Sequence, residues 1–125
     1  MANGIDSEQK HYSVLNLNAG TEVAGHVVVA GTSAARKKGL LGVNGLQNGA
    51  GLWIAPCEAI HTVGMKMPID VIFLDRELRV CKLASGVRPW RVSISLKAHS
   101  VLELEAGAIP RSNTHIGDRL RFQAA

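Results

Sequence analysis

The segment Ile-Asp-Val-Ile-Phe-Leu-Asp at residues 69–75 constrains the fold more than any other part of the sequence. Successive side chains of an extended strand point to opposite faces, so a strand with one solvent face alternates apolar and polar residues. Here both faces are apolar, with Ile69, Val71 and Phe73 on one face and Ile72 and Leu74 on the other. We therefore expect residues 69–75 to form a central strand that is covered on both sides.

Several other short segments are rich in β-branched and apolar residues and are bounded by turn-forming residues. The further strands that we expect are residues 11–18, 22–31, 51–55, 79–85, 100–107 and 117–122. In the last of these, Leu120 and Phe122 would point inward, and Arg119 and Arg121 would point outward. The segment Ser-Ala-Ala-Arg-Lys-Lys-Gly-Leu-Leu instead predicts one short helix near residues 33–41, because alanine, arginine and lysine favour helices.

These elements predict a mainly β (α+β) fold, namely a single-domain antiparallel β-barrel or sandwich of about seven or eight strands with one short helix. A chain of 125 residues fits one domain. We assign residues 1–10, which are polar, to a flexible N-terminal tail. Residues 11–123 form the single domain of this prediction.

Composition narrows the classes of partner and compartment. No run of 18 apolar residues is present, so we expect no membrane-spanning helix. The first residues lack a basic segment followed by an apolar block, so the sequence as given predicts a cytoplasmic protein with thiols at Cys57 and Cys81. The net charge is +4 and only 4% of residues are aromatic, which makes nucleic acid an improbable partner. We expect a monomer.

A cluster of mostly polar residues lies just before the central strand and at its start, and this cluster is the main candidate site. Its members are Cys57, His61, Thr62, Met65, Lys66 and Asp70, with Trp90 of the segment Arg-Pro-Trp-Arg as a further member. The group lacks a full catalytic set. We therefore expect a non-enzymatic binding or accessory module, whose crevice takes an unknown small ligand or a protein partner.

Two other functions remain as alternatives. A thiolate beside an imidazole is the nucleophile and base of cysteine enzymes, so Cys57 and His61 are the catalytic candidates, although the sequence names no third residue to orient them. Cys57, His61, Met65 and Met67 are also soft ligands that suit Cu(I) and, less well, zinc. The paired spacing of zinc ligands is absent, so we assign no metal and no cofactor.

Asp70 and Trp90 each have a structural interpretation beside the functional one. Asp70 lies inside the apolar strand and needs partners there, for which His61, Thr62 and Lys66 are the candidates. Asp75, at the end of the same strand, is expected to start a turn. Trp90 is expected to cap one end of the barrel, with an exposed anchor held by cation–π contacts as the alternative.

A series of motifs resembles a known family. In chain order these motifs are Gly39-Leu40-Leu41-Gly42, Gly51-Leu52-Trp53, Met65-Lys66, Pro68-Ile69-Asp70-Val71-Ile72-Phe73-Leu74-Asp75, Val101-Leu102-Glu103-Leu104 with Ala106-Gly107, and Gly117-Asp118. In this combination and order, over residues 22–122, the chain resembles the bacterial and archaeal family called domain of unknown function 192. The resemblance implies a compact, mostly β domain with short helical pieces and no established activity.

The resemblance also carries expectations about context and site. Many members of the family look exported, and some are encoded near pilus-assembly or envelope genes, which implies an accessory role in such systems. This chain lacks the export segment, and it lacks an Asn-Thr pair that many members carry before the Pro-hydrophobic-Asp step. It carries instead a Cys-x-x-x-His-Thr stretch, as in one variant of the family. Cys57, His61 and Thr62 are therefore the candidates specific to this variant.

Overall fold

The structure is a computed structural model that describes residues 11–30, 49–62 and 65–124. The expected tail at residues 1–10 and the expected helix near residues 33–41 lie outside the described residues. In the described ranges, the chain forms nine strands and one short helix. These elements are β1 (His11–Asn16), β2 (Thr21–Ala30), β3 (Ala50–Ile54), β4 (Ala59–His61), β5 (Ile69–Leu74), β6 (Val80–Val87), β7 (Val92–Ile94), β8 (Ser100–Glu105), α3 (Ala108–Arg111) and β9 (Leu120–Ala124).

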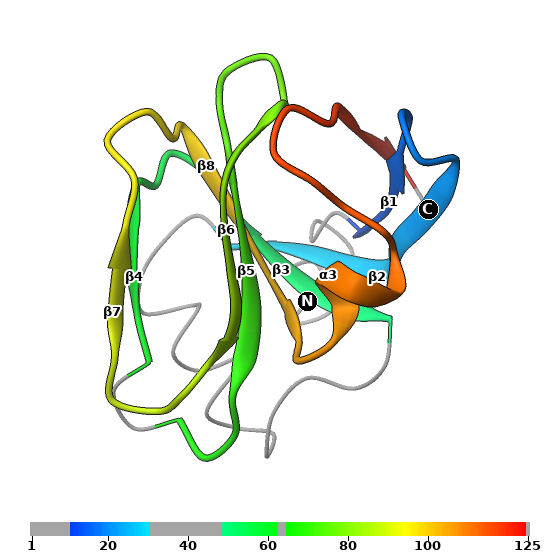
Figure 1. The fold of residues 1–125 in the computed structure, drawn as a ribbon. Coiled ribbons are helices and arrows are strands. Elements are labelled where there is room, and N and C mark those ends of the chain that lie inside the picture. Colours follow the sequence, from blue (N-terminus) through cyan, green and yellow to red (C-terminus); the bar gives the residue numbers. More distant parts are fainter. Residues whose placement is uncertain (1–10, 31–48, 63–64, 125) are drawn as a thin grey trace, which may run out of the picture.

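Seven of the strands form one curled sheet in the order β6-β5-β8-β3-β2-β1-β9. Figure 1 shows this sheet bending so that its two ends approach each other. Neighbouring strands are antiparallel except β2 and β3, which are parallel. The fold is therefore mostly antiparallel, as the sequence predicts, with one parallel pair. Parallel neighbours cannot be joined by a tight turn, and residues 31–49 separate β2 from β3 along the chain.

The curled sheet closes at one end only. An isolated bridge joins Arg79, before β6, to Arg119, before β9. The backbone N–H of Val80 donates to the carbonyl of Asp118 at 2.8 Å, and that of Leu120 donates to the carbonyl of Leu78 at 2.9 Å. These bonds join the two edge strands where they begin. The result is a half-barrel rather than a closed barrel, in agreement with the mainly β fold predicted from the sequence.

Strand β5 is the central element that the sequence predicts, and all six of its residues are buried. Its two faces contribute to two different core clusters. Ile72 and Leu74 pack inside the curl with residues of β1, β2, β8 and β9. Ile69, Val71 and Phe73 pack on the outer side with residues of β3, β4 and β8. The prediction of two covered faces is therefore confirmed.

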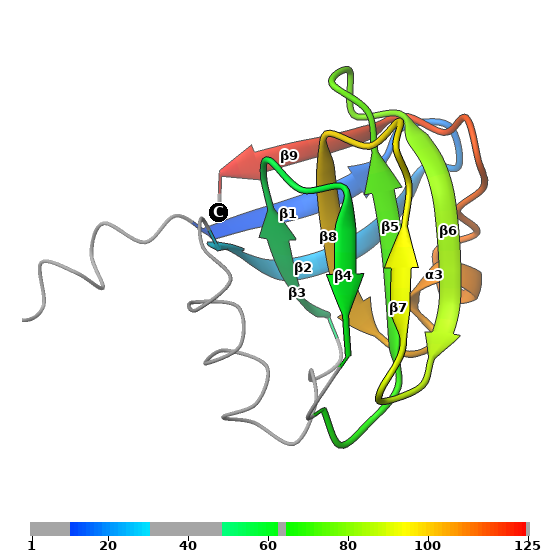
Figure 2. The ribbon, with the colours of Figure 1, turned by 90° about the vertical axis from the view of Figure 1, so that its left-hand side faces the viewer.

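A second, two-stranded sheet of β4 and β7 covers the outer side of β5 (Figure 2). Ile60 of β4 is 2% exposed and belongs to the same apolar cluster as Val71 and Phe73. The sequence did not predict β4, β7 or α3. The first two have three residues each and α3 has four, which is too short for a periodic pattern to show.

Candidate functional site

The residues expected to share one crevice are divided among several places in the structure. Asp70 lies in the core, Thr62 and Trp90 form a turn at one end of the β4–β7 sheet, and His61 lies on the outer face of that sheet. Cys57 lines a pocket at strand ends and also packs against the core cluster that contains Met65. Each place suits a different role.

Asp70 is fully buried, and its partners differ from those expected. Its Oδ1 accepts a hydrogen bond from the backbone N–H of Gly86 at 2.7 Å. Its Oδ2 accepts from the backbone N–H groups of Gly107 at 3.1 Å and Ile109 at 2.9 Å. Backbone donors thus take the place of the expected partners His61, Thr62 and Lys66. Asp70 joins β5 to the end of β6 and to α3, which is the structural role that its buried position predicted.

Thr62 holds the turn that carries Trp90. Its Oγ1 donates to the carbonyl of Arg88 at 2.6 Å and accepts from the backbone N–H of Arg91 at 2.8 Å. Its own carbonyl accepts from the backbone N–H of Trp90 at 3.0 Å and from that of Met65 at 3.2 Å. Thr62, Met65 and Trp90 are therefore brought together by hydrogen bonds of the backbone.

Trp90 does not cap the barrel. Its side chain is 67% exposed, and its φ of 66° lies in the left-handed region that non-glycine residues seldom adopt. The expectation of an end cap is wrong, because the turn held by Thr62 directs the indole outward. Met65, by contrast, is buried in the outer core cluster, and Lys66 is exposed.

The outer face of the β4–β7 sheet carries His61. The register places His61 opposite Val92 and Ala59 opposite Ile94, while Ile60 lies opposite Ser93 on the buried face. His61 is half-buried on the outward side. Its neighbours across the sheet are therefore aliphatic.

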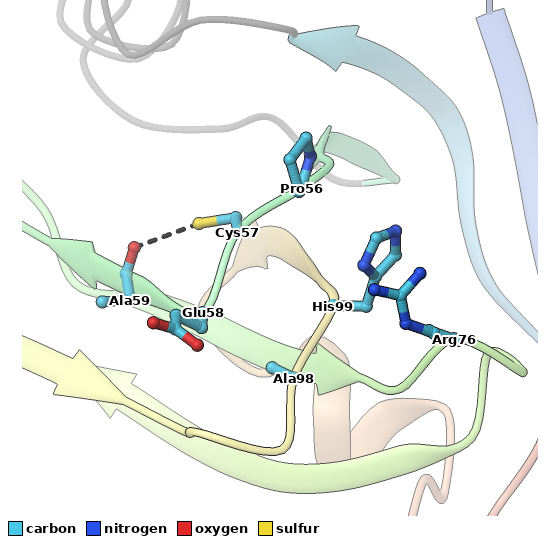
Figure 3. A pocket seen from close by; sticks show the side chains of 7 residues that line it. All are labelled: Pro56, Cys57, Glu58, Ala59, Arg76, Ala98 and His99. Atoms are coloured by element: carbon cyan, nitrogen blue, oxygen red, sulfur yellow. Dashed lines mark hydrogen bonds between the residues drawn. The ribbon is translucent and has the colours of Figure 1, made fainter.

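Cys57 lines an open pocket of about 560 Å³. The pocket is formed by links between strands, and its lining residues are Pro56, Cys57, Glu58, Ala59, Arg76, Ala98 and His99. Figure 3 shows Arg76 and His99 together on one side, with Cys57 and Glu58 across from them. Among the described residues, His61 is not part of this lining, so the imidazole nearest the Cys57 pocket belongs to His99.

The backbone around this pocket is held on each side. The backbone N–H of Cys57 donates to the carbonyl of His99 at 2.8 Å, and the backbone N–H of His99 donates to the carbonyl of Leu74 at 2.7 Å. Arg76 lies in the tight turn that Asp75 was expected to start. The Asp75 Oδ1 accepts from the backbone N–H groups of Glu77 at 2.9 Å and Arg79 at 3.0 Å, which confirms that turn.

The Cys57 thiol is itself a hydrogen-bond donor. Its Sγ donates to the carbonyl of Ala59 at 3.0 Å (Figure 3). This hydrogen bond can be made only by the protonated thiol, whereas the nucleophile of cysteine enzymes is the thiolate. Cys81, the other cysteine, also carries a thiol, and its Sγ donates to the carbonyl of Phe73 at 3.4 Å.

A second hollow of about 460 Å³ adjoins the Cys57 pocket. The two share Glu58, Arg76, Ala98 and His99, and the second extends along Asp75, Glu77, Leu96 and Lys97. Together they form one groove over the turn between β5 and β6 and the link from β7 to β8. Within the described ranges, no three His, Cys, Asp or Glu side chains are grouped so that they could hold a metal ion.

Sequence reasoning missed Arg76 and the role of His99. Arg76 is one of several charged residues in a turn, and His99 was one of several scattered histidines. Their proximity depends on β5 and β8 being neighbours in the sheet. The sequence gives no signal of that pairing, because it joins segments that are far apart along the chain.

Three comparisons with known proteins give a family and two similar structures. The model of the family DUF192, described as "Uncharacterized ACR", matches residues 8–122. No protein with a curated function is similar enough to this chain to be matched. Among the described ranges, no helix is long and apolar enough to cross a membrane.

The two solved structures share the fold at low sequence identity. One is a candidate transcription regulator from Sinorhizobium meliloti, with a TM-score of 0.77 and 20% identity, covering 91% of this chain and 93% of that one. The other is a protein of unknown function from Novosphingobium aromaticivorans, with a TM-score of 0.71 and 22% identity, covering 90% of this chain and 84% of that one. At these identities the likeness establishes the fold alone.

Proposed function

Since this chain belongs to the DUF192 family, as its motifs predicted, and the family has no described activity, we propose a function from the pocket itself. The protein is a small non-enzymatic binding module that holds a small anionic ligand, a carboxylate or a phosphate, between Arg76 and His99. The observation that carries this proposal is that these two side chains line one open pocket on a backbone fixed by hydrogen bonds. The accessory role in envelope or pilus-assembly systems stays a prediction of the resemblance.

The chemistry of the pocket favours an anion with a second polar group. The Arg76 guanidinium presents donors in a planar fork that matches carboxylate and phosphate oxygens. The His99 imidazole offers a further donor on the same side. Glu58 lies on the opposite side and accepts hydrogen bonds, so it suits an ammonium or hydroxyl group of the same ligand. The volume of about 560 Å³ is in the range of small-molecule sites.

The turn that carries Arg76 is held by hydrogen bonds before any ligand binds, which lowers the entropic cost of binding. Arg76 follows Asp75, whose side chain bonds two backbone N–H groups of the turn. His99 is fixed by backbone bonds to both Cys57 and Leu74. A preformed site loses less conformational entropy on binding than a mobile one. The hydrogen bond from the Cys57 thiol to Ala59 favours this binding role over the Cys57–His61 enzyme.

A thermal-shift screen tests the proposal. The panel holds inorganic phosphate, phosphoserine, dicarboxylates and free amino acids, each with and without the substitution Arg76→Gln. A ligand at a hundred times its Kd stabilises a protein by about 2.7 kcal/mol, which raises the melting temperature by several degrees. We expect at least one anion to stabilise the wild type and not the Arg76→Gln variant.

A matched control separates site binding from general charge effects. Arg121 is an exposed arginine on β9, outside the pocket lining. The Arg121→Gln variant loses the same charge, so it should keep the ligand-induced shift in full. The proposal fails if no member of the panel stabilises the wild type, or if both variants lose the shift equally.

A further inference from the structure

The β4–β7 sheet presents an apolar stripe to solvent. Trp90 is 67% exposed, Val92 72%, Ile94 50% and Leu96 80%. Val92 and Ile94 occupy alternate positions of β7, and their pairing with His61 and Ala59 places them on the outward face. Trp90 and Leu96 flank this strand in the chain. Large apolar side chains that are exposed close together are unusual in a monomeric protein and mark interaction surfaces.

The stripe is concentrated rather than scattered. Seven large apolar side chains are exposed among the described residues, and they are Leu17, Met67, Trp90, Val92, Ile94, Leu96 and Ile116. Five of these seven belong to residues 65–68 or 90–96. Those two segments meet at Thr62, whose carbonyl accepts the backbone N–H groups of both Met65 and Trp90. Most of the exposed large apolar side chains of the described chain therefore lie in these two neighbouring segments.

The charged residues within the two segments that carry these apolar side chains have one sign. The segments 59–68 and 86–98, which include these side chains, contain Lys66, Arg88, Arg91 and Lys97 and no aspartate or glutamate. All four of these cationic residues are exposed. The two arginines flank Trp90 along the chain, and Lys97 follows Leu96. Glu58, Asp75 and Glu77 adjoin Leu96 and Lys97 at the other end of the face, so its cationic border is the part next to Trp90. An apolar centre with cations on this side matches a surface that is apolar inside and anionic at its rim.

We propose that the face formed by Trp90, Val92, Ile94 and Leu96, with its bordering lysines and arginines, docks on the surface of an anionic lipid bilayer. The aliphatic side chains and the indole enter the boundary between headgroups and acyl chains, where tryptophan is favoured. The cations bind lipid phosphates and contribute roughly 1 kcal/mol each, which is a factor of about five in partitioning. Leu96 and Lys97 border the groove that contains Arg76 and His99, but Trp90, Val92 and Ile94 do not line it, so the inference does not depend on the proposed ligand.

The same observations disfavour three other partners for this face: a second copy of the chain, a strand of another protein, and a nucleic acid. Two copies of this chain face to face would oppose cation to cation, which costs free energy. An added β-strand from a protein partner would meet an edge where the Ile94 carbonyl already accepts the Lys82 ammonium at 2.6 Å. Single-stranded nucleic acid needs aromatic side chains for base stacking, and Trp90 is the only one in the two segments.

Vesicle co-sedimentation tests this inference. The purified protein is mixed with vesicles of phosphatidylcholine alone, or with vesicles that contain about a third phosphatidylglycerol. We expect sedimentation with the anionic vesicles only, weaker in high salt, and a blue shift of Trp90 fluorescence on binding. Failure to sediment with the anionic vesicles would overturn the proposal.

Paired variants identify the surface. Val92→Ser combined with Ile94→Ser should weaken binding to the anionic vesicles about tenfold or more, because two apolar anchors are lost. Arg88→Glu combined with Arg91→Glu should weaken it by a similar factor. The matched controls are Leu17→Ser with Ile116→Ser, and Arg119→Glu with Arg121→Glu, all at exposed positions on other elements. Both controls should bind as the wild type does, and melting temperatures check that each variant is folded.

Two further results would assign the face to another occupant and so overturn the proposal. Binding that survives the loss of Val92 and Ile94 but disappears in salt would be simple adsorption of a cationic protein. A concentration-dependent rise in solution mass by light scattering, abolished by the same two substitutions, would make the face an interface between copies of the chain.

Discussion

The carboxylate of Asp70 holds helix α3 against the sheet, because its Oδ2 accepts a hydrogen bond from the backbone N–H of Ile109 at 2.9 Å. The same carboxylate accepts from Gly86 and Gly107, so three backbone donors depend on it. Asp70→Asn replaces one acceptor oxygen by a donor that faces an N–H group. We expect a loss of about 2–4 kcal/mol in the free energy of unfolding, measured by urea denaturation. Asp75→Asn, in an exposed turn, should cost about 1 kcal/mol or less, and a larger loss there than at Asp70 would contradict this role.

Asp118 makes stability depend on pH at the acid end. The hydrogen bond from the Asn16 side chain is the main cause that lowers the pKa of Asp118 below 3.8; burial opposes it, and the backbone N–H and charge of His115 add to it. A group whose pKa is lower in the folded state stabilises the fold above its unfolded pKa and loses that contribution as pH falls through the folded pKa. The stability difference between wild type and Asp118→Asn should therefore be largest at neutral pH and shrink below 3.8. Urea denaturation from pH 7 to pH 3 measures it, and parallel curves would show that Asp118 contributes nothing.

Thr62 is expected to be needed for the turn that exposes Trp90. Thr62→Val keeps the shape of the side chain but leaves the Arg88 carbonyl and the Arg91 N–H without their hydroxyl partner. We expect a loss of about 2 kcal/mol in the free energy of unfolding and faster hydrogen exchange of the Arg91 amide. Thr62→Ser retains the hydroxyl and should lose less than half as much. Equal losses in the two variants would mean that the methyl group, rather than the hydroxyl, holds the turn.

Gly51 is expected to tolerate no side chain, because neighbouring strands approach it closely. A Cβ at this position would lie 2.8 Å from Cδ2 of Leu104 and 3.1 Å from the backbone oxygen of Glu103. Gly51→Ala should therefore cost about 1–3 kcal/mol of stability, since the backbone oxygen cannot move away without breaking the sheet. Gly25→Ala is the matched control, because its Cβ would meet only the mobile end of Glu22 at 3.3 Å. A smaller loss at Gly51 than at Gly25 would refute this account of the packing.

Cys57 is expected to react as an ordinary thiol, because its Sγ donates to the Ala59 carbonyl. In a Cys81→Ser background, labelling with a thiol reagent at neutral pH should proceed no faster than labelling of glutathione. A rate more than about tenfold higher would indicate an activated nucleophile and would revive the Cys57-dependent enzyme. The same experiment on His99→Ala would then show whether that imidazole is responsible.

The sequence predicted those strands in which the apolar residues are the ones that the fold buries. Strand β5 was predicted because apolar residues occupy both of its faces, and the structure buries both. Strand β7 was missed because its outward residues, Val92 and Ile94, are apolar and its inward residue, Ser93, is polar. This arrangement reverses the usual rule, so an alternating pattern could not tell the inside from the outside. Helix α3 was missed because it has four residues and no side-chain cap at Gly107.

The residues of the candidate site were predicted less well than the strands. Which residues share the pocket depends on which strands are neighbours in the sheet. Cys57, Arg76 and His99 line one pocket but lie on three separate links between strands. The sequence singled out Cys57 and the local residues His61 and Thr62, since nearness along the chain was the available guide. The structure instead turns His61 to the outer face of the β4–β7 sheet and uses Thr62 to hold a turn. Pocket partners from distant segments cannot be found without the order of the sheet.

The adjacency of β1 and β9 has a mechanical consequence. These strands are antiparallel, and Tyr12 pairs with Ala124, so these two residues lie at the same end of one ladder. A force that pulls residues 11 and 124 apart loads the rungs of this ladder one after another instead of all together. Strands β1 and β9 should therefore separate one residue pair at a time, at low force. The domain would be mechanically weak whenever force is applied through residues 11 and 124.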